Sequence, residues 1–168
     1  MEIKTIVGFK EIPKSSHYVD SNGYEIWTEY DEFGHEIYFK SSEGIECWGE
    51  MNPSNQMEYT YKTSDNVVMI QTFDDQGNAI KCDIPDGEMV NIYFRYDKFG
   101  IPIECKSSKH RWVGVPDSIE PRLYHYVDKE GYLWHKRYDK NGNSIRYDGC
   151  DGSWYKVEYE YRTVTITK

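Results

Sequence analysis

The sequence predicts an all-β protein, an antiparallel meander of about 12 short strands in one strongly twisted or curled sheet. Three observations support this fold class. β-branched and aromatic residues dominate the apolar composition, with 15 isoleucines, 10 valines and 16 tyrosines against two leucines and one alanine. Turn residues recur every 10 or 11 positions. No apolar stripe with the helical period of 3.6 residues runs longer than two turns.

The expected turns follow a regular grid. Three sets of positions share a spacing of 11 and then 10 residues, with asparagine replacing glycine once because it also tolerates a positive φ. They are Gly23, Gly34 and Gly44; Asn66, Gly77 and Gly87; and Gly131, Gly142 and Gly152. Turns at this spacing leave strands of about five to seven residues between them, as in a β-meander.

A motif of aromatic residue, aspartate, two variable residues, glycine, two more residues and isoleucine occurs four times. The copies begin at Tyr30, Phe73, Tyr96 and Tyr138. We expect each aspartate to accept a hydrogen bond from the backbone N–H two residues later. Tyrosines 12 residues upstream of three copies divide the single domain 1–168 into modules of about four strands, at about 18–60, 61–108 and 126–168. Four-strand modules leave a small propeller-like arrangement open as an alternative.

Residues 106–122 interrupt the grid. Pro116 and Pro121 cannot donate a hydrogen bond within a central strand, so this stretch is expected to form a long loop. Long loops in compact domains are often functional, which makes Arg111 and Trp112 candidate contact residues.

The net charge of -9 and the predicted pI near 5.0 argue against binding to nucleic acid, which requires a basic stripe. An acidic balance suits solubility or a cationic partner. The N-terminus shows no leader pattern and no stretch approaches a membrane span, so we expect a cytoplasmic protein that does not bind membranes. Cys47, Cys82 and Cys105 each follow an isoleucine by two residues and are expected to be reduced and buried. No Cys-x-x-Cys pair is present, and no metal or other cofactor is expected.

Catalytic constellations are not evident, and we expect no enzymatic activity. The five histidines are scattered, but His125 and His135 could approach each other across adjacent strands. With a carboxylate such as Asp128 they could form a metal or acid–base site, although cross-strand packing is the simpler interpretation.

The Tyr-Asp-x-x-Gly-x-x-Ile units, with a second glycine ten residues later, resemble the YD repeat of RHS-type proteins. The pattern that runs from Gly23 through Trp27 and Tyr30-Asp31 to Gly34 equally resembles the variant MORN repeats of some bacterial antitoxin-like proteins. The resemblance covers most of residues 18–160 and supplies no catalytic residues. It implies proximity to polymorphic bacterial toxins and to the small acidic cytosolic proteins that neutralise them.

We therefore expect an immunity protein, or antitoxin, that blocks the active site or substrate groove of a cognate bacterial toxin, in particular a nuclease. A carbohydrate- or surface-binding β-repeat module is the main alternative, and a structural repeat that self-associates through open sheet edges is another. The oligomeric state stays open. The candidate contacts combine acidic turn tips, the irregular loop and an aromatic residue: Trp48, Asp74, Asp75, Asp86, Glu88, Arg111 and Trp112.

Overall fold

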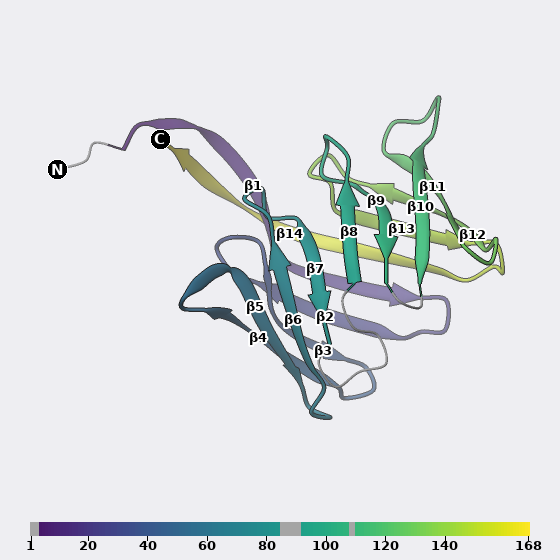
Figure 1. Ribbon diagram of the computed structural model, residues 1–168, viewed down its shortest axis with the longest axis horizontal. Helices are drawn as coiled ribbons and strands as arrows, with labels where there is room; N and C mark the ends of the chain where they lie inside the picture. The colour runs from purple at the N-terminus through teal and green to yellow at the C-terminus, as the bar shows by residue number, and fades with distance from the viewer. Residues whose placement is uncertain (1–3, 85–91, 108–109) are drawn as a thin grey trace.

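The computed structural model describes residues 4–84, 92–107 and 110–168, and the regular structure of this part is entirely β (Figure 1). Its strands are β1 (Ile6–Asp20), β2 (Glu25–Tyr30), β3 (Glu36–Ser41), β4 (Glu46–Asn52), β5 (Asn55–Thr63), β6 (Val68–Phe73), β7 (Ala79–Asp83), β8 (Ile92–Tyr96), β9 (Pro102–Lys106), β10 (Arg111–Pro116), β11 (Leu123–Asp128), β12 (Leu133–Tyr138), β13 (Ser144–Gly149) and β14 (Trp154–Thr167).

Every strand pairs antiparallel with its neighbours in sequence, and β1 also pairs with β14, which closes the sheet into a barrel. The expected antiparallel meander is therefore confirmed. The expected open, curled sheet of about 12 strands, and the propeller-like alternative, are wrong. The reason is the long pairing of the two terminal strands, which runs from Ile6 opposite Thr167 to Asp20 opposite Tyr155.

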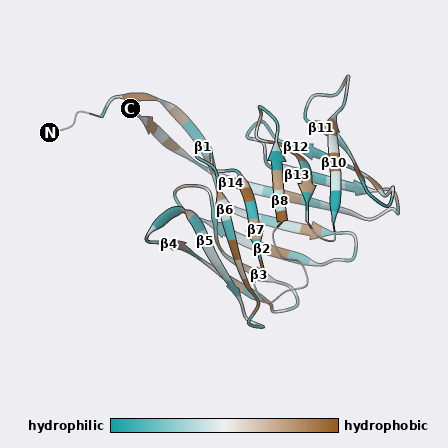
Figure 2. Cartoon of the chain, in the orientation of Figure 1, coloured by the Kyte–Doolittle hydropathy of each residue, from teal (hydrophilic) through white to brown (hydrophobic). Residues whose placement is uncertain are grey.

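Hydrophobic and hydrophilic residues are interspersed along the strands (Figure 2). Burial alternates along β12 and β14, because successive side chains of a strand point in turn to the barrel interior and to the outside. Among the residues that the structure describes, the interior holds two separate hydrophobic clusters. The first consists of Cys47, Tyr59, Tyr61 and Phe73, and the second of Ile101, Tyr124, Tyr126 and Tyr138. Cys47, Cys82 and Cys105 are buried, as expected, and burial raises the pKa of the Cys82 thiol to about 11.

The two clusters belong to two similar halves of the barrel. In each half a buried tyrosine faces a glycine across the sheet: Tyr61 opposite Gly49, and Tyr126 opposite Gly114. The second pair follows the first by 65 residues, and Tyr124 likewise follows Tyr59 by 65. By this offset of 65 residues, strands β2–β7 of one half correspond to strands β8–β13 of the other. The tyrosine spacing had instead suggested three modules.

The turn grid is confirmed wherever it falls on described residues. Glycines at its positions have φ between 79° and 87°, and Asn66 has φ 66°. Gly87 lies outside the described residues. The expected role of the motif aspartates is confirmed as well, since Asp31, for example, accepts the backbone N–H groups of Phe33 and His35. Equivalent pairs of bonds form at the other three copies, Asp74, Asp97 and Asp139.

Three of these turns are also tied to the barrel wall by a buried or half-buried tyrosine. The hydroxyl of Tyr59 donates to Asp31 at 2.6 Å and that of Tyr124 donates to Asp97 at 2.5 Å. Tyr161 donates in the same way to Asp139. The motif is thus a structural unit, in which one carboxylate organises its own turn and anchors a neighbouring strand.

The long loop expected over 106–122 is wrong for its central part, because residues 111–116 form β10. This strand pairs with β9 through Arg111 to Val113 and with β11 through Trp112 to Pro116. Pro116 is tolerated because it is the last residue of the strand. The remaining loop, 117–122, begins with Asp117, which accepts the backbone N–H groups of Ile119 and Glu120.

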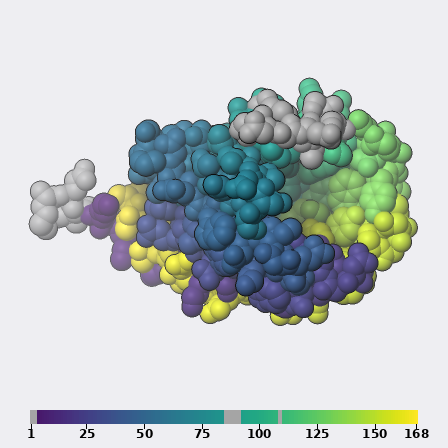
Figure 3. All heavy atoms as spheres, turned by 90° about the horizontal axis from the view of Figure 1, so that it is seen from below, coloured from purple at the N-terminus to yellow at the C-terminus, as the bar shows by residue number. Residues whose placement is uncertain are grey.

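The barrel is neither round nor completely filled. Seen from the end opposite the repeat turns, the molecule is hollowed between its blue-teal and green-yellow halves (Figure 3). At the other end, β1 and β14 continue beyond the barrel as a two-stranded ribbon (Figure 1). Both features help to explain an accessible surface of 10971 Å², whereas a compact monomer of this mass exposes about 8,700 Å².

Candidate functional site

The outer surface of five consecutive barrel strands, β14, β1, β2, β3 and β4, carries a concentration of aromatic and acidic side chains. The register sets them in rows, because residues that face each other on antiparallel strands point to the same side. One row runs from Glu160 through Ser15, Glu29 and Tyr38 to Trp48. The adjacent row runs from Glu158 through His17, Trp27 and Lys40 to Glu46.

We call this surface the acidic aromatic face. Its residues are His17, Glu25, Trp27, Glu29, Tyr38, Glu46, Trp48, Glu158 and Glu160.

The aromatic residues of the face are exposed and are ordered by their neighbours. Trp27 is 45% exposed and stacks on the His17 ring, with the ring centroids 5.2 Å apart and an interplanar angle of 8°. Trp48 is 49% exposed, and its ring centroid lies 6.1 Å from that of Tyr38. Exposed large aromatic side chains that are already held in place can enter an interface at a low cost in conformational entropy.

Three carboxylates of the face are held by neighbouring side chains. Glu25 lies 2.6 Å from His17 Nε2, and Glu160 pairs with Lys14 at 3.5 Å. Glu46 accepts the Tyr38 hydroxyl at 2.6 Å, and this hydrogen bond raises the pKa of Tyr38. These contacts fix the orientation of the aromatic rings as well as the position of the negative charges.

Two further carboxylates of the face are uncompensated. Within the part of the chain that the structure describes, Glu29 and Glu158 take part in no hydrogen bond or ion pair between side chains. Together with Glu160 they surround a shallow groove of about 400 Å³, which is also lined by Ser15, Trp27 and Tyr38. The groove is therefore a negatively charged surface with aromatic walls.

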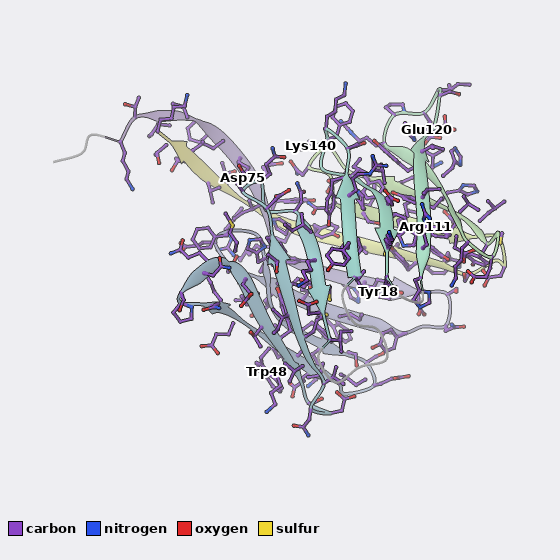
Figure 4. All side chains as sticks on the ribbon, viewed as in Figure 1. Tyr18, Trp48, Asp75, Arg111, Glu120 and Lys140 are labelled. Atoms are coloured by element: carbon purple, nitrogen blue, oxygen red, sulfur yellow. The ribbon has the colours of Figure 1, made fainter. Side chains whose placement is uncertain are left out.

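Of the candidate contacts chosen from the sequence, Trp48 lies on this face, at the lower edge of the barrel in Figure 4. Asp75 is an exposed residue at the tip of the β6–β7 turn, near the upper end. Asp74 directly precedes it and holds that turn through its hydrogen bonds to the N–H groups of Gln76 and Asn78. The structure does not bring Trp48 and the two aspartates together.

The two candidates from the expected loop are also separated from the face. Arg111 is exposed at the start of β10, on the far side of the barrel from Trp48 (Figure 4), and pairs with Glu104 at 3.8 Å. Trp112 points inward and packs against Tyr126 and Trp134, with ring centroids 5.3 Å and 6.1 Å away. Trp112 was selected as a surface contact because a loop was expected here. Residues 111–116 form a strand instead, and Trp112 lies on the inward side of it. Asp86 and Glu88 lie outside the described residues.

Most residues of the acidic aromatic face are not indicated by any pattern in the sequence. A signal for part of it was present, since the alternation in 157–161 places Glu158 and Glu160 on the side opposite Val157, Tyr159 and Tyr161. Their neighbours could not be recognised, because Glu158 meets His17 only through the pairing of β14 with β1.

Comparison with models of known protein families and with curated protein sequences finds no match. The described part of the chain contains no helix that is long and apolar enough to cross a membrane. Nor do the residues in 4–84, 92–107 and 110–168 include a group of three or more His, Cys, Asp or Glu side chains placed to hold a metal ion.

Proposed function

We propose that this chain is an immunity protein that neutralises a cognate bacterial toxin, a nuclease, by covering its substrate groove with the acidic aromatic face. The observation that carries the proposal is the combination on one face of exposed Trp27 and Trp48 with the carboxylates of Glu29 and Glu158, which have no side-chain partner among the described residues. Tryptophan and tyrosine are frequent anchors of tight protein interfaces. Negative charge around such anchors complements a cationic groove that normally receives phosphates.

The closed barrel suits this role. The face is built on five neighbouring strands of a continuous sheet, so its side chains are presented on a rigid support. Glu158 and Glu160 are two residues apart on one strand and therefore lie roughly 7 Å from each other. Several fixed carboxylates at such spacings produce a local negative field that steers a cationic partner into the complex.

The proposal is tested by expressing the polypeptide encoded immediately upstream, with and without this protein, and measuring growth. We expect toxicity that the wild-type chain relieves, and co-purification of the two proteins. The triple variant Glu29→Lys, Glu158→Lys, Glu160→Lys should abolish rescue and lower the affinity by a factor of about 100 or more, mainly through repulsion across the interface.

A matched control carries the same charge change elsewhere. The triple variant Asp75→Lys, Glu120→Lys, Glu130→Lys reverses exposed charges on turns and loops away from the face, and it should retain rescue. If rescue is lost in the control but not in the face variant, the toxin contacts the turns and loops and not the acidic aromatic face. Retention in both variants would refute an acidic contact.

A carbohydrate-binding module is a second candidate, favoured by the arrangement of Trp27, Tyr38 and Trp48 as neighbouring aromatic residues beside a groove. Glycan binding through aromatic stacking should persist at 1 M salt, whereas steered association with a cationic toxin should slow as the ionic strength rises. A glycan array probed with wild-type protein and with Trp27→Ala, Trp48→Ala distinguishes the two functions.

A further inference from the structure

The outer surface of β11, β12 and β13 carries a cluster of titratable side chains that the acidic aromatic face does not include. His125, His135 and Asp148 face one another in register on these three adjacent strands. The approach of the two histidines that the sequence indicated is confirmed, with the Nδ1 atoms of His125 and His135 2.8 Å apart. Asp128, the carboxylate suggested for them, faces Trp112 instead.

The carboxylate that meets the pair is Asp117, at the start of the loop between β10 and β11. Its Oδ2 lies 2.7 Å from Nε2 of His125. Two backbone N–H groups of the same loop donate to the other oxygen of Asp117 and hold it in place. The backbone bonds and the contact with His125 lower the pKa of Asp117, so it is ionised and acts as the acceptor.

These contacts assign the protons of the pair. Because Asp117 accepts from Nε2–H of His125, the Nδ1 of a neutral His125 carries a lone pair directed at His135. His135 must then donate its Nδ1–H across the 2.8 Å gap. The pair thus presents two imidazole nitrogens that converge on one position, which is occupied by a single shared proton.

We propose that His125 and His135 form a binding site for one divalent transition-metal ion, such as Zn²⁺, Ni²⁺ or Cu²⁺, which replaces the shared proton. Imidazole is a preferred ligand of these metals, and a ligating histidine commonly donates its second N–H to a carboxylate, as His125 does to Asp117. Two nitrogens bound tetrahedrally at about 2.0–2.1 Å from a metal are about 3.3 Å apart, so the nitrogens must separate by about half an ångström and each lone pair must turn by about 35° from the line that joins them.

The remaining groups around the pair leave the other coordination positions open. Asp148 is held by Arg146, with contacts of 2.7 Å and 3.1 Å, and Arg137 pairs with Glu120 at 3.1 Å. Both guanidinium groups are therefore already paired with carboxylates, which limits their repulsion of a cation. The site has two protein ligands, consistent with the lack of a preformed three-residue group in the described chain, and water or a partner's side chain completes the coordination.

This chemistry sets the selectivity of the site and its response to pH. Cu²⁺ should bind most tightly, with Ni²⁺ and Zn²⁺ weaker, and Mg²⁺ and Ca²⁺ should not compete because they prefer oxygen ligands. Protons and metal ions compete for imidazole nitrogens, so acid should weaken metal binding. Neither expectation depends on toxin binding.

The test is calorimetric titration of the whole chain with the chloride salts of Zn²⁺, Ni²⁺, Cu²⁺ and Mg²⁺, in a buffer that does not bind metals. We expect one site per chain for the first three ions and no binding of Mg²⁺. The variant His135→Ala should weaken binding at least tenfold. Asp117→Asn, which leaves both ligands in place, should weaken it about 10-fold to 100-fold.

His17→Ala is the matched control, because His17 is equally half-exposed and also contacts a carboxylate, yet faces no second histidine. This variant should bind metal like the wild type. Unaltered circular dichroism and thermal unfolding would show that the His135 variant is folded, since that side chain is exposed. Equal affinity in wild-type and His135→Ala protein, or equal losses in the His17 and His135 variants, would overturn the proposal.

Discussion

Replacing Gly114 by alanine should destabilise the barrel, although the same substitution at an unconstrained position stabilises a protein. A Cβ at residue 114 would lie 2.5 Å from Cδ1 of Tyr126 and 3.1 Å from its Cζ. The Tyr126 ring is 2% exposed, and its hydroxyl donates to the carbonyl of Pro102 at 2.9 Å and lies 2.6 Å from the hydroxyl of Tyr138. The ring therefore cannot move aside without breaking buried hydrogen bonds.

The size of the effect follows from two opposing terms. Overpacking a well-filled interior costs about 1–3 kcal/mol. Lowering the entropy of the unfolded chain returns about 0.4–1 kcal/mol when glycine becomes alanine. We expect a net loss of about 1–2 kcal/mol, visible as a lower midpoint in urea with an unchanged slope. For a domain of this length, each kcal/mol lowers the melting temperature by about 2–4 °C.

The chain supplies an internal control and a replicate. In Gly8→Ala the new Cβ meets no atom nearer than 3.9 Å, so this variant should be as stable as the wild type or slightly more stable. In Gly49→Ala the Cβ would lie 2.5 Å from Cε1 of Tyr61 and 2.7 Å from the carbonyl oxygen of Glu36, and we expect a comparable loss. Equal stability of the Gly114 and Gly8 variants would refute the packing argument.

Three further predictions concern the turns and the interior. Tyr124→Phe removes the hydroxyl that donates to the Asp97 carboxylate at 2.5 Å and should cost about 1.5–3 kcal/mol in urea unfolding, whereas Tyr93→Phe, at a half-exposed position, should cost nothing measurable. The Glu36 side chain is exposed to solvent, but the protein atoms around it disfavour its charged form and raise its pKa above the ordinary value of 4.5. The stability linked to its protonated form is therefore present below pH 4.5 and is lost as the pH rises through the folded-state pKa. Unfolding measured from pH 4 to 8 should show a flatter profile for Glu36→Gln, and identical profiles would contradict this origin of the pH dependence. Asn66 has φ 66°, a conformation that alanine adopts less readily than asparagine or glycine. Asn66→Ala should therefore cost about 1 kcal/mol, while Asn66→Gly should not, as thermal unfolding of both variants would show.

Local features of this fold could be predicted from the sequence because they depend on interactions between residues close in the chain. Asp31 and Gly34, or Asp139 and Gly142, define their turns through bonds that span two to four residues, and the structure confirms them. The alternation of Val157, Tyr159 and Tyr161 with Glu158 and Glu160 likewise needs only the period of a strand.

Closure of the barrel, and with it the candidate binding face, was decided by tertiary structure alone. Periodicity states which side of a strand is apolar but not which distant strand lies beside it, so nothing local shows that Glu158 meets His17. The same limitation applies to β10. Its proline indicates a loop, but pairing with β9 on one side and β11 on the other makes this segment a strand. The histidine pair shows both cases. The sequence indicated that His125 and His135 could approach each other across neighbouring strands. That Asp117 contacts His125 depends on the path of the loop 117–122, which the sequence does not show.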